Sequence, residues 1–226
     1  MTAGPDLAKE LGVTAFLDHD SEEVGEFVRS VLPPVDVTPQ ERAIKLYYAV
    51  RDRVHYEIYG ADLSRDGLRA SQVVRAGTGM CTHKSVLYAA ALRAVGIASR
   101  LVFTDVRNHL ASDRIKKFLG GDVFHYHCLT SVYLAGKWVK ATPTFNKRLC
   151  RLYGITPLEF DGAADSIHHP FDLNGRKHME FLRTHGEFDD LPYDMLINGL
   201  RAAHPHLFAG ANRFVAGSLT GDAQHV

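Results

Sequence analysis

One segment of the chain, residues 79–96 with the sequence GMCTHKSVLYAAALRAVG, constrains the fold more than any other. Its apolar residues lie round most of a helical circumference, so we expect a helix over 81–95 that is central and buried. Gly96 stands in the usual position of a C-terminal helix cap. A domain built round such a helix must surround it with layers supplied by the rest of the chain.

The sequence before this helix predicts further helices. Thr38-Pro39-Gln40-Glu41 combines a capping threonine, a proline suited to the first turn and a glutamate that completes a capping box, so a helix is predicted over 39–54. A short helix is expected over 71–76, ended by Gly77. The opening segment to about Asp36 is expected to pack on the main body as a strand or a short helix.

The sequence after the central helix predicts an antiparallel sheet. Residues 125–134 and 137–142 indicate a hairpin round Ala135-Gly136. We therefore predict an α+β chain, a single domain over residues 1–226, in which the helix that carries Cys81 packs on the sheet. The remaining expectations are a strand over 99–104, a polar loop over 105–122, a strand over 155–161, and helices over 176–184 and about 190–203.

Composition narrows the class of protein. The 226 residues are 46% apolar and 23% charged, which is typical of a globular chain with a core. Basic and acidic residues number 26 each, so no nucleic-acid partner is expected. We expect no membrane span and no signal peptide. The chain has three cysteines, Cys81, Cys128 and Cys150, and this small odd number is typical of reduced thiols in a cytoplasmic protein.

Cys81 is the first candidate for chemistry. At the start of a helix its thiol lies at the positive end of the helix dipole, which favours the thiolate and lowers a cysteine pKa. Gly77 and Gly79 allow unusual backbone turns just before it. The position suits a nucleophile, although a free cysteine is also often a small buried hydrophobic residue.

The hairpin supplies histidines near a second cysteine. In a hairpin with a two-residue loop, His127 lies opposite Thr144 and is a diagonal neighbour of Thr142 on one face, while Cys128 points to the other face. If the central helix packs on the face of His127, Cys81 can meet His127. Cys128 then cannot reach Cys81 unless the strand twists sharply or carries a bulge.

Three segments over roughly residues 39–144 resemble the transglutaminase-like superfamily, whose fold is related to papain-like thiol enzymes. They are ERAIKLYYAVRDRVHYEI, SQVVRAGTGMCTHKSVLYAAALRAVGIASRL and HCLTSVYLAGKWVKATPT. The resemblance implies that Cys81 is the nucleophile, that His127 is the base and that the residue at 142 orients His127. The family usually has an aspartate there. Thr142 can accept a hydrogen bond but carries no charge to stabilise an imidazolium.

Other residues are candidates for the roles round this pair. Asn146 is an alternative partner of His127 by residue type, and Asp105 and Asp122 are others. The backbone N–H of Cys81 is the expected oxyanion donor. Gln72 could assist it, although an exposed helix position is the simpler interpretation. Trp138 could wall the cleft, although a core position is favoured.

The sequence thus predicts a thiol-dependent acyl-transfer enzyme without a cofactor. A peptide, protein or small amide would acylate Cys81, with His127 as base, and water or an amine would accept the acyl group. Water as acceptor makes the protein a peptidase or amidase, and an amine makes it a transamidating enzyme. Thr142 favours an alternative, a catalytically degenerate binding or scaffold domain of the same fold.

A zinc protein is a further alternative. Its candidate ligands are Cys81, His83, His125, His127 and Cys128. However, Cys81 and His83 are two residues apart on a helix and point in nearly opposite directions, and no familiar metal-binding spacing is present. The pair His168-His169 is expected to be solvated or to belong to a lid rather than to bind a metal, and His204-Pro205-His206 is expected to be a solvated helix end.

Overall fold

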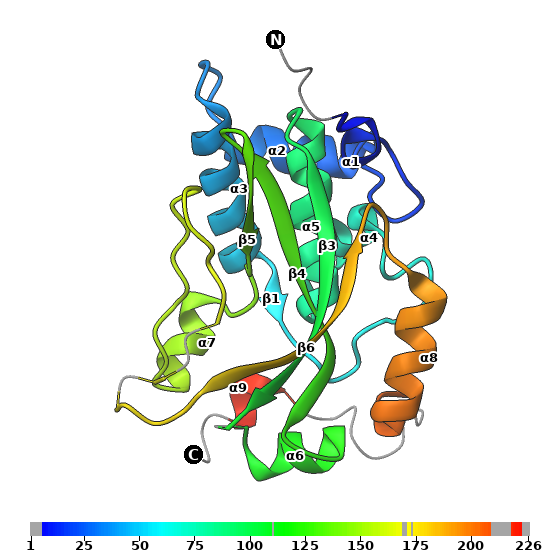
Figure 1. Ribbon diagram of the computed structural model, residues 1–226, viewed down its shortest axis with the longest axis vertical. Coiled ribbons are helices and arrows are strands. Elements are labelled where there is room, and N and C mark those ends of the chain that lie inside the picture. The colour runs from blue at the N-terminus through cyan, green and yellow to red at the C-terminus, as the bar shows by residue number, and fades with distance from the viewer. Residues whose placement is uncertain (1–5, 110, 169–170, 173, 209–217, 223–226) are drawn as a thin grey trace.

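The computed structural model describes residues 6–109, 111–168, 171–172, 174–208 and 218–222. Its centre is α5 (Cys81–Ala94), in which every residue from Cys81 to Arg93 is buried. The predicted central helix and its start at Cys81 are therefore confirmed. Three other helices pack against α5: α2 (Glu22–Val31), α3 (Pro39–Arg53) and α4 (Ala70–Ala76) (Figure 1).

A four-stranded sheet lies in front of α5 in the view of Figure 1. Its strands run in the order β5-β4-β3-β6, and every neighbouring pair is antiparallel. The predicted hairpin register is confirmed, because Leu134 pairs with Lys137. The α+β class, a central helix on an antiparallel sheet, is confirmed. The strands are β3 (Ser99–Asn108), β4 (Val123–Leu134), β5 (Lys137–Ala141) and β6 (Met179–Phe188).

Smaller elements surround this core. Two short strands form a parallel pair beside the start of α5. They are β1 (His55–Tyr56) and β2 (Thr78–Gly79), and the other elements are α1 (Ala8–Leu11), α6 (Asp113–Leu119), α7 (Lys147–Leu152), α8 (Tyr193–Ala203), η1 (Pro205–Phe208) and α9 (Leu219–Asp222). The longest helix, α3, has 15 residues, and within the described ranges no helix combines the length and apolarity that crossing a membrane requires.

Local signals place the helix boundaries where they were predicted. At the start of α3 the Thr38 hydroxyl accepts from the amide of Glu41 (3.2 Å), and the Glu41 carboxylate accepts from the amide of Thr38 (2.9 Å). Gly77 ends α4 with a φ of 62°, a left-handed conformation that costs glycine little. The opening segment, expected as a strand or short helix, contains α1 and α2.

The predicted loop over 105–122 is wrong. Strand β3 continues to Asn108, and α6 follows. Ser112 caps α6 by accepting from the amide of Ile115 (3.3 Å), and the helix buries Ile115, Phe118 and Leu119. Charged residues lie between its three apolar positions and make its amphipathic pattern short, so the sequence alone does not predict this helix.

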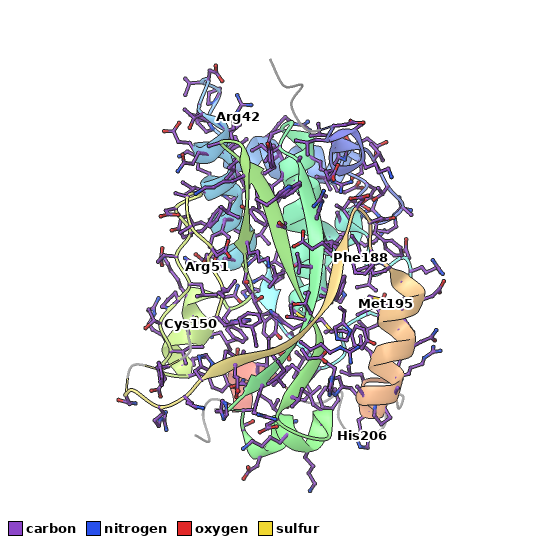
Figure 2. All side chains as sticks on the ribbon, viewed as in Figure 1. Arg42, Arg51, Cys150, Phe188, Met195 and His206 are labelled. Atoms are coloured by element: carbon purple, nitrogen blue, oxygen red, sulfur yellow. The ribbon has the colours of Figure 1, made fainter. Side chains whose placement is uncertain are left out.

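Two further predictions in the C-terminal third are also wrong. The helix over 176–184 is the strand β6, because pairing with β3 along its length outweighs local helix propensity. Residues 155–161 form no strand. Side chains of α3 bind this segment instead: Arg51 Nη1 donates to the carbonyl of Leu158 (2.6 Å), and Tyr48 Oη donates to that of Phe160 (3.4 Å). Figure 2 labels Arg51, whose side chain is fully buried.

The end of α3 is tied to the first turn of α5. The Lys84 ammonium donates to the carbonyls of Arg51 (2.8 Å) and Val54 (2.7 Å), and the side-chain amide of Asn146 donates to the same two carbonyls. These carbonyls have no partner within α3, because Arg51 belongs to its last turn and Val54 is the residue that caps its end. Burial lowers the pKa of Lys84 well below the usual range. This contact fixes the position from which α5 starts.

Replacing this lysine should destabilise the fold. In Lys84→Met two buried hydrogen bonds are lost, and we expect the free energy of unfolding to fall by about 2 kcal/mol. Urea unfolding measures the change, with Lys117→Met on the exposed face of α6 as the matched control. Equal stability of the two variants would show that the contact contributes nothing.

Candidate active site

Cys81 begins α5, and its side chain is only 4% exposed. The strand β2 reaches it through Gly79, where an added Cβ would lie 2.5 Å from the Cβ of His83. Only glycine therefore permits this close approach. The ring of His83 donates through Nε2 to the carbonyl of Asp62 (2.9 Å), so it is engaged away from the histidines of β4.

The first turns of α5 lie along the edge of β4. The ladder between β4 and β5 ends at the pair Thr130–Ala141. Past this pair, Ser85 Oγ donates to the carbonyl of Cys128 (3.0 Å), and the backbone of Cys128 acts on the Cys81 thiol by lowering its pKa. The thiol therefore lies at a strand edge, beside the residues that follow His127.

The expected facing of the hairpin is wrong in one respect. The helix α5 packs on the face of Cys128 and Thr130, because Thr130 Oγ1 donates to the carbonyl of Ser85 (3.2 Å) and Cys128 belongs to the core that contains Cys81. The expectation that Cys128 cannot reach Cys81 allowed an exception for a bulge, and this exception applies. A bulge lies next to this point, where the register with β3 shifts and Tyr126 has a φ of 56°.

Cys81 and His127 nevertheless line one cavity. Its volume is about 20 Å³, room for roughly one water-sized group. Cys81 lies at the edge of β4 rather than over either face of the sheet. It can therefore share a cavity with His127, although His127 is on the face opposite to the one that α5 covers. Other residues line it too: Tyr56, Ile58, Met80, Leu119, Phe124, His125, Leu200, His204 and Leu207.

Burial sets the protonation of both groups. It raises the pKa of the Cys81 thiol, and the hydrogen bond from the backbone of Cys128 opposes this only in part. The sequence-based expectation of a lowered thiol pKa is therefore wrong. Burial also lowers the pKa of His127 to about 4. At neutral pH the site holds a neutral thiol and a neutral imidazole rather than an ion pair.

The ring of His127 contacts another histidine. The Nε2 atoms of His127 and His168 are 2.9 Å apart, and each residue is 5% exposed. Thr142 does not make this contact: it is fully buried, and its hydroxyl has no hydrogen-bond partner among the described residues. Asn146 is engaged elsewhere, since its side-chain oxygen accepts from the amide of Tyr56 (2.7 Å).

The two aspartates proposed as alternatives also have other partners. Asp105 accepts from His185 Nε2 (2.6 Å) and from the amide of Tyr126 (3.1 Å), and it pairs with His125 Nδ1 (3.2 Å). These bonds lower the pKa of Asp105 although its burial opposes the change. Asp122 lies 3.5 Å from Arg107. Neither is bonded to His127.

Two other candidates lie outside the site. Gln72 is half-buried on α4 and does not line the cavity of Cys81. Trp138 is half-buried on the outer face of the sheet, where its ring packs on Tyr133 (5.2 Å) and under the guanidinium of Arg100 (4.2 Å). It neither walls the cleft nor belongs to the core cluster.

Two of the remaining histidines differ from their expected solvation. His168 is buried, and so is His204, whose Nδ1 bonds the carbonyl of Leu119 (2.7 Å). His206 is exposed, as expected, and His169 lies outside the described residues. No spacing in the sequence marks His168, because it comes from a loop far from β4 along the chain. In the described part of the chain, no group of three or more His, Cys, Asp or Glu side chains could hold a metal ion.

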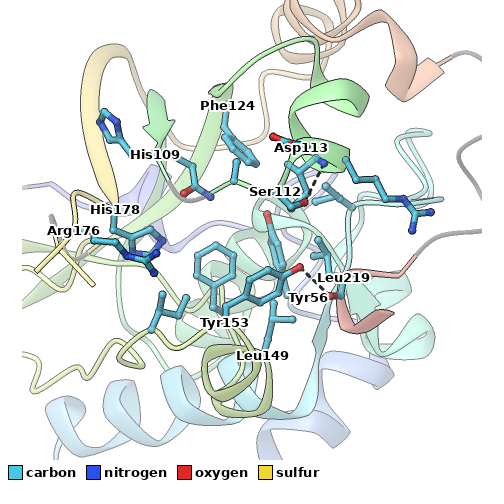
Figure 3. Close-up of a pocket in the computed structure, with 17 residues that line it drawn as sticks. Tyr56, His109, Ser112, Asp113, Phe124, Leu149, Tyr153, Arg176, His178 and Leu219 are labelled. Atoms are coloured by element: carbon cyan, nitrogen blue, oxygen red, sulfur yellow. Dashed lines mark hydrogen bonds between the residues drawn. The ribbon is translucent and has the colours of Figure 1, made fainter. Parts of the chain in front are cut away.

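A larger cavity of about 570 Å³ adjoins the small one (Figure 3). Tyr56, Ile58 and Phe124 line both and therefore form the wall between them. Figure 3 shows Tyr56, Phe124, Leu149 and Tyr153 round its apolar part, with polar side chains such as His109 and Arg176 at another side. The volume falls in the range of small-ligand pockets.

Comparison with known proteins identifies the family. Residues 29–143, half of the chain, match the transglutaminase-like superfamily, so the chain belongs to it. Among solved structures, a protein from Cytophaga hutchinsonii that is proposed to be a cysteine protease is similar, with 17% identity and a TM-score of 0.48. That match covers 63% of this chain and 43% of the other. None of the curated proteins compared matches significantly.

The neutral thiol–imidazole pair predicts how Cys81 reacts with iodoacetamide. Because the thiolate is the nucleophile and burial raises the thiol pKa, the alkylation rate should rise about tenfold per pH unit between pH 6 and pH 8. Peptide mapping by mass spectrometry follows Cys81 separately, with Cys150 on α7 as the internal control (Figure 2). A rate independent of pH down to pH 5 would instead indicate a preformed thiolate–imidazolium pair.

Proposed function

We propose that the protein is a thiol-dependent acyl-transfer enzyme that acts on an amide or an ester. The observation that carries the proposal is the shared cavity of Cys81 and His127 in a chain of the transglutaminase-like superfamily. Cys81 occupies the first position of α5, and His127 occupies the position at which this family places its base. A nucleophile and a histidine in one cavity are the minimum for covalent acyl transfer.

The reaction follows from these two groups. His127 takes the thiol proton as the sulfur attacks the carbonyl carbon, and it returns the proton to the leaving amine or alcohol when the acyl–sulfur bond has formed. The N–H groups of the first turn of α5 have no acceptor within the helix. They are the donors available for the oxyanion that forms in the attack. Water or an amine then accepts the acyl group.

The larger cavity suits the body of the substrate. It shares a wall with the cavity of Cys81, and apolar and aromatic side chains make up most of its lining. We therefore expect a substrate with an apolar or aromatic group next to the reacting carbonyl. Because Cys81 is buried, the wall of Tyr56, Ile58 and Phe124 must move before the carbonyl carbon of the substrate can reach the sulfur.

The proposal predicts an acyl-enzyme on Cys81. Incubation with p-nitrophenyl acetate should release p-nitrophenol and add one acetyl group to the peptide that contains Cys81, and Cys81→Ala should abolish both. Cys150→Ala is the matched control and should leave both unchanged. Release of acetate measures water as acceptor, and a labelled primary amine measures transamidation. If Cys81 remains unacylated, the enzyme function is wrong, and the degenerate scaffold that Thr142 favours takes its place.

Opening the wall should expose the thiol. In Phe124→Ala the small and large cavities would join, so the alkylation of Cys81 by iodoacetamide should accelerate several-fold at constant pH. Phe188→Ala on β6 (Figure 2) is the control, because Phe188 is also half-buried but lines neither cavity. Unchanged reactivity in Phe124→Ala would show that this wall does not limit access.

A further inference from the structure

We propose that His168 is the positioning residue of His127 and takes the role that an aspartate at position 142 has in the family. The inference rests on the proposed function of Cys81 and His127. Its basis is the contact of 2.9 Å between the Nε2 atoms of two histidines that are both almost fully buried. The centroids of the two rings are 4.7 Å apart, and the ring planes are tilted by 50°.

Hydrogen-bond chemistry gives this contact a direction. Two neutral imidazoles that meet through Nε2 share a single proton, so one ring donates and the other accepts. If His168 accepts, the proton of His127 is on Nε2 and its Nδ1 lone pair is available to a thiol. If His168 donated, His127 would carry its proton on Nδ1 and could not act as a base at that nitrogen.

The accepting arrangement also suits the reaction. When His127 takes the proton from Cys81 onto Nδ1, both of its nitrogens become donors, and His168 Nε2 continues to accept without moving any proton. His168 therefore keeps the ring of His127 oriented and in the tautomer that accepts a proton at Nδ1. As a neutral acceptor it holds the imidazolium less strongly than an aspartate would.

The loop that carries His168 is docked beside the end of β5. The amide of Ser166 donates to the carbonyl of Lys140 (2.7 Å), and Ser166 forms a parallel bridge with Ala141, the residue before Thr142. Ser166 Oγ also donates to the carbonyl of Glu159 (2.7 Å). The loop that carries His168 therefore lies next to position 142, where the family has the aspartate that orients the histidine.

Aromatic packing fixes the ring of His168. It lies 5.6 Å from the ring of Phe145 and 6.3 Å from that of Phe181. Asn146, Asp105 and Asp122 are bonded to groups other than His127. The Thr142 hydroxyl has no hydrogen-bond partner among the described residues. The contact with His168 thus joins two buried side chains and explains why a threonine at 142 is compatible with an oriented His127.

The tautomer of His127 tests the inference without an activity assay. Long-range ¹H–¹⁵N correlation spectra at pH 7 distinguish Nε2–H from Nδ1–H imidazoles, and the difference from the spectrum of His127→Gln assigns the signals. We expect His127 to be protonated at Nε2 in the native protein and His168 at Nδ1. A native His127 protonated at Nδ1 would overturn the inference.

Kinetics with p-nitrophenyl acetate test the same claim. His168→Phe keeps a ring but removes the acceptor, so kcat should fall about 100-fold with little change in KM, since a general base contributes at least this factor. His168→Gln restores an acceptor oxygen and should recover much of the rate. His206→Phe, an exposed histidine on η1 (Figure 2), is the matched control and should not change the rate.

Thr142→Val separates His168 from the family position. It removes the hydroxyl without changing the shape of the side chain, and kcat should remain at the native value. A loss as large as that of His168→Phe, or a native rate in His168→Phe, would overturn the inference. If Cys81→Ala keeps the native rate, the proposed function fails instead, and the tautomer measurement still decides the contact.

Discussion

The backbone of Cys128 holds the first turns of α5 at the edge of β4, and the placement of the candidate site depends on this contact. Ser85 binds its carbonyl, the same backbone lowers the pKa of the Cys81 thiol, and Lys84 ties the same turn to the end of α3. Each of these residues lies within five positions of the helix start. The turn that presents the thiol is thus fixed on both sides, while the strand edge keeps His127 close to it.

Burial at this edge has an electrostatic consequence. It raises the pKa of the Cys81 thiol and lowers that of His127, so the resting pair is neutral. A neutral pair needs no aspartate to stabilise an imidazolium at rest. A neutral acceptor such as His168 is then adequate to orient the ring, and the charged state arises only as the thiol attacks.

Local sequence signals predicted the parts of the fold that depend on neighbouring residues. The apolar helix of Cys81, the capping box of Thr38 and the register of the hairpin were all recoverable. Long-range pairing decided the rest. The strand β6 forms because β3 lies beside it, and the segment 155–161 is held by side chains of α3. The face of β4 that packs on α5, the bulge in β4 and the position of His168 beside His127 likewise depend on long-range contacts. The periodicity of the local sequence does not predict such contacts.

A crystal structure of the protein alkylated at Cys81 with iodoacetamide would test the central claim that Cys81 and His127 form one reactive site. The account predicts that Nδ1 of His127 faces the modified sulfur in van der Waals contact, roughly 3.5–4 Å away. The added amide should enter the larger cavity with its oxygen toward the first turn of α5. A His127 ring turned away across β4, with no imidazole near the sulfur, would contradict the account.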